Sequence, residues 1–499
     1  MPSKKKLREI YSEFTENQVL VRKGNDVPGY MVHTDKHNAN FFFGTKNQVQ
    51  IEDGDFGTKT INEKTYIGKP QDHDGHILVV GGAGSGKSSC VVMPTLETWN
   101  GAIFAIDIKG ELTAYWNSLK ASHKRHAKIF NLTNISSDKN DTFASYDPFH
   151  FLRNDDKDNL VQNAKEIAQS IIPLSPDVRD PFWIQSAQNV LTGALLHGFG
   201  IDTSFNTTLT RVLNAPIWEL VNEIANSDNS IAKLFISQFA GLKNPSENRM
   251  LTGISAELNS KVTTFVTSLR IKDVLGDTGN PASWEDLETH NIFMAIAEDK
   301  LGQWDGAISM MLTQLIRTLE RRPDKQSPEG KDLPPILLLL DEFPRLGKVD
   351  VIQNAVSTLR SKGVTICVVI QSLAQLDKVY GKETRQIIID NCSYKAILSV
   401  TDPDNQKVFS DMIGSVTVGL GGVSASSNKK SENYTITINE TREPIVHPHE
   451  LATLKDIVLM TPEGYCRMDK APYYAKPDSF IANVSKAKKS RVGYTPSSS

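Results

Sequence analysis

Short runs of apolar residues recur along the chain and predict buried β-strands. Apolar runs bounded by polar or glycine residues are typical of strands that are covered on both faces. Several of the segments between them have apolar residues at helical spacing, as in residues 88–98 and 306–321. This alternation predicts an α/β protein with a mostly parallel central sheet. The runs are residues 77–80, 102–106, 128–131, 291–296, 336–340, 364–370 and 396–400.

The middle of the chain has a different pattern. No strong strand run appears between residues 151 and 285, where apolar residues recur at helical spacing. A βαβ unit takes about 30 residues, so a segment of this length must hold a separate all-helical domain inserted into the α/β part. The predicted helices are residues 159–172, 181–199, 217–225, 231–239 and 248–269.

Composition and charge argue against a polycation, a disulfide-bonded protein and a membrane-spanning protein. The 55 Lys and Arg residues and 58 Asp and Glu residues give a net charge of −3, so any nucleic-acid contact requires a local basic patch. The four cysteines lie far apart and favour a reduced, cytoplasmic protein. Residues 181–201 carry no charge, but polar residues interrupt the segment. Its apolar residues recur on one face of a helix, which is typical of a core helix in a soluble domain. We therefore expect no transmembrane segment.

A phosphate-binding motif follows the first strong strand. Residues 81–88 match the pattern G-x-x-x-x-G-K-S between a strand and a helix. Glycines let successive backbone N–H groups point at phosphate oxygens, and the helix adds its positive end. We expect Lys87 to reach the β- and γ-phosphates and Ser88 to ligate Mg²⁺. The candidate nucleotide-binding residues are Gly81, Gly82, Ala83, Gly84, Ser85, Gly86, Lys87, Ser88 and Ser89.

A pair of acids predicts the hydrolytic half of the site. Asp341 and Glu342 follow the apolar run 336–340, where one carboxylate can hold Mg²⁺ and the next can polarise the attacking water. Gln371 ends the following strand, where a side chain could orient that water or sense the γ-phosphate. The arginine that stabilises the transferring phosphoryl group is expected to be Arg345 or Arg360, with Arg385 as a further candidate. These motifs predict hydrolysis of a nucleoside triphosphate with ATP and Mg²⁺ as cofactors.

These features divide the chain into five predicted parts. A β-rich N-terminal segment precedes a nucleotide-binding domain, which the helical domain splits in two, and a basic, Ser-rich, disordered tail ends the chain. The ranges are residues 1–70, 71–150, 151–285, 286–480 and 481–499.

Further motifs make the sequence resemble one family. It resembles the type IV coupling proteins of conjugation and type IV secretion, the TraG/TraD-type ATPases of the FtsK/HerA class. Besides the phosphate motif, the shared elements are Asp107-Ile-Lys-Gly-Glu-Leu112, Pro181-Phe-Trp183, Leu340-Asp-Glu-Phe-Pro-Arg-Leu-Gly347, Gln371-Ser-Leu-Ala-Gln-Leu376, Tyr380-Gly381 and Asn391-Cys392. The resemblance extends from about residue 40 to about residue 475.

The resemblance implies a RecA-like motor domain with an inserted all-α domain. It also implies a homo-hexamer on DNA and ATP, and is compatible with a monomer in isolation. It implies relaxase and DNA as partners, together with components of the secretion channel. Family members usually carry transmembrane helices ahead of the phosphate loop, and this sequence shows none. Either it docks on a separate membrane protein, or the anchor is missing, and we favour the first. We therefore expect a cytoplasmic protein, peripherally associated with the bacterial cell membrane through a separate membrane anchor protein.

Two functions follow from this reading. In the first, the chain is an ATP-dependent coupling protein that recruits a relaxase–DNA or protein substrate and drives its transfer through the channel. In the second, it is an ATP-switched adaptor that holds substrates through the helical domain without processive translocation. A GTPase is not favoured, because the sequence lacks an Asn-Lys-x-Asp element for guanine selection.

Overall fold

The computed structural model describes residues 27–52, 58–119, 125–133, 143–174, 178–241, 249–276, 281–428 and 431–475. The predicted tail, residues 481–499, therefore lies outside the described residues. The chain divides into two compact units. Unit 1 comprises Met1–Trp99, Val369–Gln375 and Cys392–Ser499, and unit 2 comprises Asn100–Val368 and Leu376–Asn391.

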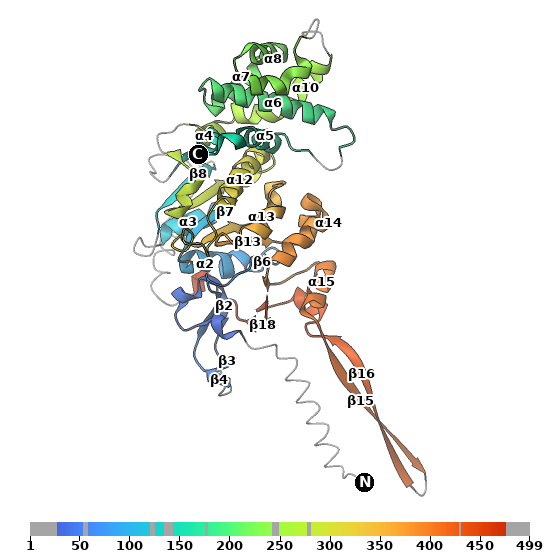
Figure 1. The fold of residues 1–499 in the computed structure, drawn as a ribbon. Helices are drawn as coiled ribbons and strands as arrows, with labels where there is room; N and C mark the ends of the chain where they lie inside the picture. Colours follow the sequence, from blue (N-terminus) through green and yellow to red (C-terminus); the bar gives the residue numbers. More distant parts are fainter. Residues whose placement is uncertain are drawn as a thin grey trace, which may run out of the picture. The chain divides into compact units, whose positions relative to one another are not determined.

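Unit 1 contains strands in the order β18-β17-β14-β6 (Figure 1). Strand β6 pairs in parallel with β14, which pairs antiparallel with β17, and β17 pairs antiparallel with β18. Val369 and Ile370, the end of β13 (Val364–Ile370), belong to this unit and adjoin β6, since Gly81 N donates to Ile370 O at 3.3 Å. The bounds are Ile77–Val80 for β6, Tyr394–Ile397 for β14, Ile457–Thr461 for β17 and Gly464–Met468 for β18.

A smaller antiparallel sheet precedes the phosphate loop in unit 1. Its order is β1-β5-β2, and its strands are Val32–His33, Thr65–Lys69 and Phe41–Lys46. A separate hairpin pairs β3 (Val49–Glu52) with β4 (Thr58–Ile61). Strand β2 packs on α2 (Met93–Thr98), where Phe42 N donates to Thr95 Oγ1 at 3.1 Å. The N-terminal strands thus support the helix that follows the phosphate loop.

Later in unit 1, the chain forms a long two-stranded ribbon, drawn in orange in Figure 1. It pairs β15 (Ser415–Asn428) with β16 (Ser431–Pro444) in one continuous antiparallel register, from Ser415 opposite Pro444 to Asn428 opposite Ser431. It lies between α15 (Pro403–Ile413) and α16 (Pro448–Ala452) in sequence.

Unit 2 contains parallel strands in the order β13-β12-β7-β11-β8. Strand β12 is central: Leu340 lies opposite Ile106 on one side and Val368 on the other. Because the strands are parallel, the residues that follow β7 and β12 lie at the same sheet edge. The bounds are Val364–Ile370 for β13, Ile336–Leu340 for β12, Ala102–Asp107 for β7, Asn291–Ile296 for β11 and Ala127–Leu132 for β8.

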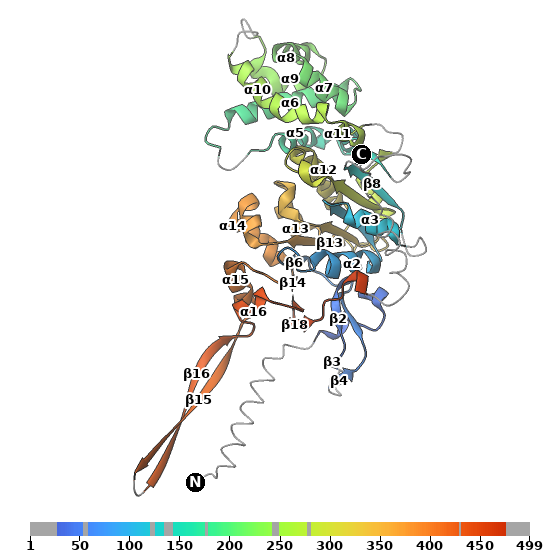
Figure 2. The same cartoon turned by 180° about the vertical axis from the view of Figure 1, so that it is seen from behind.

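Helices follow one another from Pro148 to Val274 in unit 2, as the sequence predicted (Figure 2). Helix α6 is the central one and contacts α5, α7, α8, α9 and α10. None of the helices within the described ranges is long and apolar enough to cross a membrane. The bounds are Pro148–Asn154 for α4, Leu160–Ile171 for α5, Phe182–Gly200 for α6, Phe205–Asn214 for α7, Ile217–Asn226 for α8, Ser230–Ile236 for α9, Arg249–Thr267 for α10 and Leu269–Val274 for α11.

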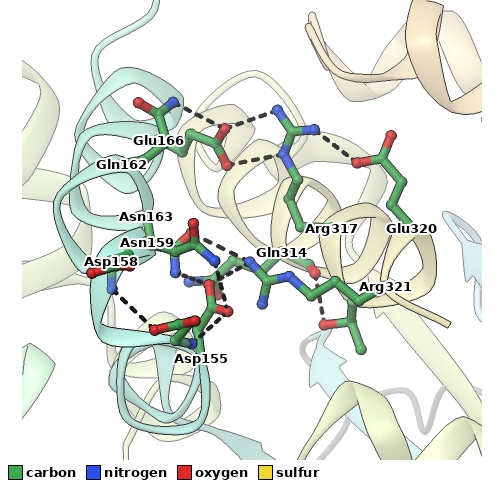
Figure 3. A network of polar contacts seen from close by, with 12 residues as sticks. Asp155, Asp158, Asn159, Gln162, Asn163, Glu166, Gln314, Arg317, Glu320 and Arg321 are labelled. Atoms are coloured by element: carbon green, nitrogen blue, oxygen red, sulfur yellow. Dashed lines mark hydrogen bonds and ion pairs between the residues drawn. The ribbon is translucent and has the colours of Figure 1, made fainter.

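An ionic network joins this helical segment to α12 (Asp305–Glu320) of the α/β part (Figure 3). Arg317 donates to both carboxylate oxygens of Glu166 on α5, at 2.8 and 3.1 Å, and to Glu320 at 2.7 Å. Arg321 donates to Asp155 at 2.5 Å, just before α5. Two-point Arg–carboxylate contacts fix orientation as well as distance, so this network sets how α5 lies on α12.

Candidate functional site

The phosphate loop of unit 1 leaves β6 and enters a short π-helix, η4 (Lys87–Val92), which continues into α2. π-Helical turns are rare and occur frequently at functional sites. Gly84 and Gly86 have φ angles of 72° and 100°, which side chains with a Cβ rarely adopt. A Cβ added at Gly84 would meet no heavy atom within 4 Å, so the described residues leave open space there.

Side chains and carbonyls within the loop define its shape. Lys87 is 8% exposed, and its ammonium donates to Gly81 O at 2.6 Å and Gly82 O at 3.1 Å. Gly82 N donates to Ser399 O at 2.7 Å, which fixes the loop to the residues after β14. The buried Ser85 Oγ has no hydrogen-bond partner among the residues that the structure describes. The loop therefore combines an inward-turned lysine with an unsatisfied hydroxyl.

The other predicted residues of unit 1 lie on or near this loop. Ala83 is exposed, whereas Ser88 and Ser89 are half-buried on η4. Gln371 follows β13 and precedes α14 (Leu373–Asn391), and its backbone N–H donates to Gln375 Oε1 at 3.3 Å. The predicted strand end at Gln371 is therefore correct.

In unit 2, acidic residues gather at the carboxyl edge of β7 and β12. Asp107 is 2% exposed and accepts a hydrogen bond from Thr113 N at 2.8 Å, at the start of α3 (Glu111–Ser118). Asp341 and Glu342 follow β12 at the same edge and are half-buried. Glu342 has φ 50° and ψ 38°, a left-handed conformation that is uncommon for a residue with a Cβ. Such backbone strain is concentrated at functional sites.

Two cations hold the carboxylate of Glu342. Arg345 Nη1 donates to Glu342 Oε2 at 2.5 Å, and Lys109 Nζ lies 3.5 Å from Oε1. Arg345 Nη1 also donates to Glu298 Oε1 at 2.7 Å. Burial alone would raise the pKa of Glu342, but the hydrogen bonds and positive charges of Arg345 and Lys109 outweigh it and lower that pKa. Glu342 therefore stays ionised at neutral pH.

The two predicted arginines lie in different places. Arg345 belongs to the 3₁₀ turn η11 (Phe343–Leu346), directly after Glu342. Arg360 is exposed and precedes β13, where its carbonyl accepts from Gly363 N at 3.3 Å. It therefore lies at the amino end of β13, the sheet edge opposite to Asp341. Arg385, the further candidate, is paired with Asp377 at 3.0 Å.

The sequence placed the motif with Asp107 and Lys109 at a strand end where α/β sheets bind ligands, but it did not predict that Lys109 contacts Glu342. Lys109 contacts Glu342 because β7 and β12 are neighbours, and that pairing joins residues far apart in the chain. The shared signal in the sequence was only that each residue follows a buried strand.

Known proteins resemble this chain in sequence and in fold. Protein VirD4 of Rhizobium rhizogenes is 23% identical over 421 residues, which cover 80% of this chain and 58% of that protein. The conjugal transfer protein TraG of Escherichia coli is 21% identical over 421 residues, 77% of this chain and 64% of that protein. The chain thus spans less than two thirds of the length of these relatives.

Solved structures of one conjugative coupling protein share the fold. The plasmid coupling protein TrwB in complex with the ATP analogue ADPNP has a TM-score of 0.62 and 20% identity, over 83% of this chain and 90% of that chain. The unbound form of TrwBdeltaN70 has a TM-score of 0.61 and 19% identity, over 79% and 84%. This likeness shows a RecA-like P-loop fold.

The family model gives the broadest match. The model described as type IV secretory system conjugative DNA transfer matches residues 12–494, nearly the whole chain. The phosphate loop and the acidic strand ends lie within that range. On this match, the chain belongs to the type IV secretory system conjugative DNA transfer family.

Proposed function

We propose that this chain is an ATP-dependent coupling protein that recruits a relaxase–DNA or protein substrate and drives its transfer through a type IV secretion or conjugation channel. Family membership supports the biological setting. The names of VirD4 and TraG relatives and of the TrwB structures point the same way. The observation that carries the proposal is the phosphate loop, whose left-handed glycines, inward lysine and unsatisfied Ser85 hydroxyl fit a triphosphate.

ATP and Mg²⁺ are the proposed cofactors. TrwB has been solved with ADPNP and with ADP and Mg²⁺, which supports both assignments. Mg²⁺, when bound, would supply a Lewis acid on the phosphate oxygens, with Ser88 and Asp341 as its protein ligands. The open space beside Gly84 and the orphaned Ser85 Oγ suit the phosphates themselves.

Each remaining residue has a proposed role. Lys87 exchanges its bonds to the carbonyls of Gly81 and Gly82 for phosphate oxygens. Glu342 orients the attacking water and accepts its proton, and Gln371 senses the γ-phosphate. Arg345 leaves Glu342 to neutralise charge on the transferring group. Arg360, at the opposite sheet edge, is the candidate for the same task on a neighbouring subunit.

We further propose the assembly and its setting. The active form is a homo-hexamer on DNA and ATP, and its partners are relaxase, DNA, the channel components and a membrane protein that anchors it. It works in the cytoplasm, peripherally associated with the bacterial cell membrane. Basic side chains of the assembled ring would hold the nucleic-acid backbone.

Phosphate release from ATP tests the motor. The purified chain is assayed alone and with single-stranded or double-stranded DNA, beside Lys87→Ala and Glu342→Gln. We expect DNA to stimulate turnover, Lys87→Ala to abolish nucleotide binding, and Glu342→Gln to bind ATP yet lose at least about 100-fold in kcat, the range of general-base catalysis.

Two outcomes would contradict the proposal. Nucleotide binding with negligible turnover on any DNA would leave only a switched adaptor. Near-normal turnover by Glu342→Gln would remove Glu342 as the group that activates water.

A further inference from the structure

A buried tyrosine in unit 2 contacts the loop that carries Arg345. Tyr380 is 9% exposed and belongs to α14. The next residue, Gly381, has φ 79° and ψ 163° and interrupts the helix. Tyr380 therefore ends the first straight part of α14, and the kink lets the helix change direction after the contact.

One side chain holds both ends of that loop. The Tyr380 ring stacks on Phe343, with centroids 5.3 Å apart and planes at 11°. Its hydroxyl accepts a hydrogen bond from Val349 N at 3.2 Å and donates to Gly347 O at 3.3 Å. Burial raises the pKa of Tyr380, so the hydroxyl keeps the proton that it donates.

The loop needs such support because its first residues are strained. Glu342 is held in a left-handed conformation directly before Phe343. Such a conformation costs about 1–2 kcal/mol and persists only where neighbouring contacts enforce it. On the side of α12, Ser309 Oγ donates to Lys348 O at 3.1 Å. The loop is thus fixed from two elements, and Tyr380 supplies the aromatic contact next to Glu342.

We propose that Tyr380 is a positioning residue for ATP hydrolysis: by fixing the backbone of residues 343–349, it holds Glu342 and Arg345 where their side chains can reach the reacting groups. The inference rests on the proposed function. Tyr380 touches no reacting group, and it acts through the backbone of the loop. Its removal should therefore affect the chemical step and leave nucleotide binding by the phosphate loop unchanged.

Tyr380→Phe tests this inference in the full chain. It keeps the stacked ring and removes both hydrogen bonds of the hydroxyl. We expect kcat for ATP hydrolysis to fall about tenfold, which corresponds to about 1.4 kcal/mol in the barrier. We expect KM for ATP and the dissociation constant of a fluorescent ATP analogue to change less than about twofold, because the contacts of the phosphate loop with the nucleotide stay the same.

Tyr146→Phe is the matched control. Tyr146 on β9 (Ser145–Tyr146) is also buried, and its hydroxyl donates to Gln314 Oε1 away from the loop. Both variants lose a buried hydroxyl, so thermal unfolding should shift by similar amounts in each. Only Tyr380→Phe should lose kcat.

The outcomes separate this inference from the proposed function. An active wild-type chain whose kcat is unchanged in Tyr380→Phe, or falls equally in Tyr146→Phe, would overturn the positioning role alone. A wild-type chain that hydrolyses no ATP would overturn the proposed function and this inference together. If Tyr380→Phe does not fold, Phe343→Leu removes the stack and keeps the hydroxyl bonds. An unchanged kcat in that variant would equally overturn the inference.

Discussion

At the scale of single residues, a positive φ angle costs little at glycine and strains any residue that has a Cβ. Gly84 and Gly86 adopt positive φ angles without a steric penalty, whereas Glu342 adopts one despite its Cβ. A Cβ at Gly86 would in addition lie 3.0 Å from Cys90 Sγ. The glycines therefore shape the phosphate loop at little cost, while the strain at Glu342 must be offset by the contacts around it.

Gly86→Ala should weaken nucleotide binding. The substitution adds strain and a close contact inside the loop, so we expect the dissociation constant of an ATP analogue to rise at least about tenfold. Gly241→Ala is the control, since Gly241 also has a positive φ, 72°, but lies in the helical segment, where no atom of the described residues comes within 4 Å of an added Cβ. Both should lose about 1 kcal/mol of stability in denaturant titration. Equal nucleotide affinity in the two variants would contradict this reading.

The sequence predicted individual site residues where a local pattern carries the chemistry. Residues 81–88 and the pair Asp341–Glu342 could be placed directly after strands because a strand, a turn and a helix start are all local signals, while their roles remain predictions. The contacts of Glu342 with Lys109 and of Tyr380 with Val349 could not be predicted. They depend on which strands are neighbours and on how a helix packs, and no spacing in the sequence encodes either.

At the scale of elements, continuous apolar runs predicted the bounds of several strands correctly. Residues 77–80, 336–340 and 364–370 were predicted as strands and have those bounds. The strand predicted at 396–400 instead spans Tyr394–Ile397, because Val400 N donates to Leu451 O and no longer pairs with β6. Helix α7 was not predicted, since its threonines weaken the helical pattern. The cap at Ser204, whose Oγ accepts from Thr207 N, is the signal that could have identified it.

The network between α5 and α12 should contribute measurably to stability. Arg317 has a side chain only 29% exposed and binds two carboxylates, so Arg317→Ala should lower the free energy of unfolding by about 1–3 kcal/mol, between exposed and buried ion pairs. Arg211→Ala removes a more exposed pair with Glu223, within the helical segment, and should cost less than about 1 kcal/mol. Chemical denaturation measures both, and equal losses would contradict a special role for the network.

At the scale of the whole molecule, the alternation of strands and helices predicted the fold class correctly. The helical character of the segment between Pro148 and Val274 was also predicted correctly, while its standing as a separate domain remains a prediction. The boundaries at residues 151 and 285 remain predictions. Contact with α12 groups the helical segment with the α/β part of unit 2, and a sequence pattern cannot reveal how two segments pack.

Removing the helical segment should separate cargo recognition from nucleotide binding. We expect a chain with residues 151–285 replaced by a short Gly-Ser linker to bind ATP analogues normally, because the phosphate loop lies in unit 1. Arg317 on α12 and Arg321 directly after it would then be hydrated. Binding of a purified relaxase, measured by titration, should be lost. Unchanged relaxase binding would assign recognition to another part of the chain.

Helix α12 touches the loop after Glu342 near its first turns, through Ser309, and grips α5 near its last turn, through Arg317. Its 16 residues make a rod about 24 Å long. Its contacts at Ser309 and Arg317 lie eight residues apart, about 12 Å along the helix axis. A single helix therefore contacts both the loop that carries Arg345 and the helical segment, so a substitution that shifts α12 is felt at both places.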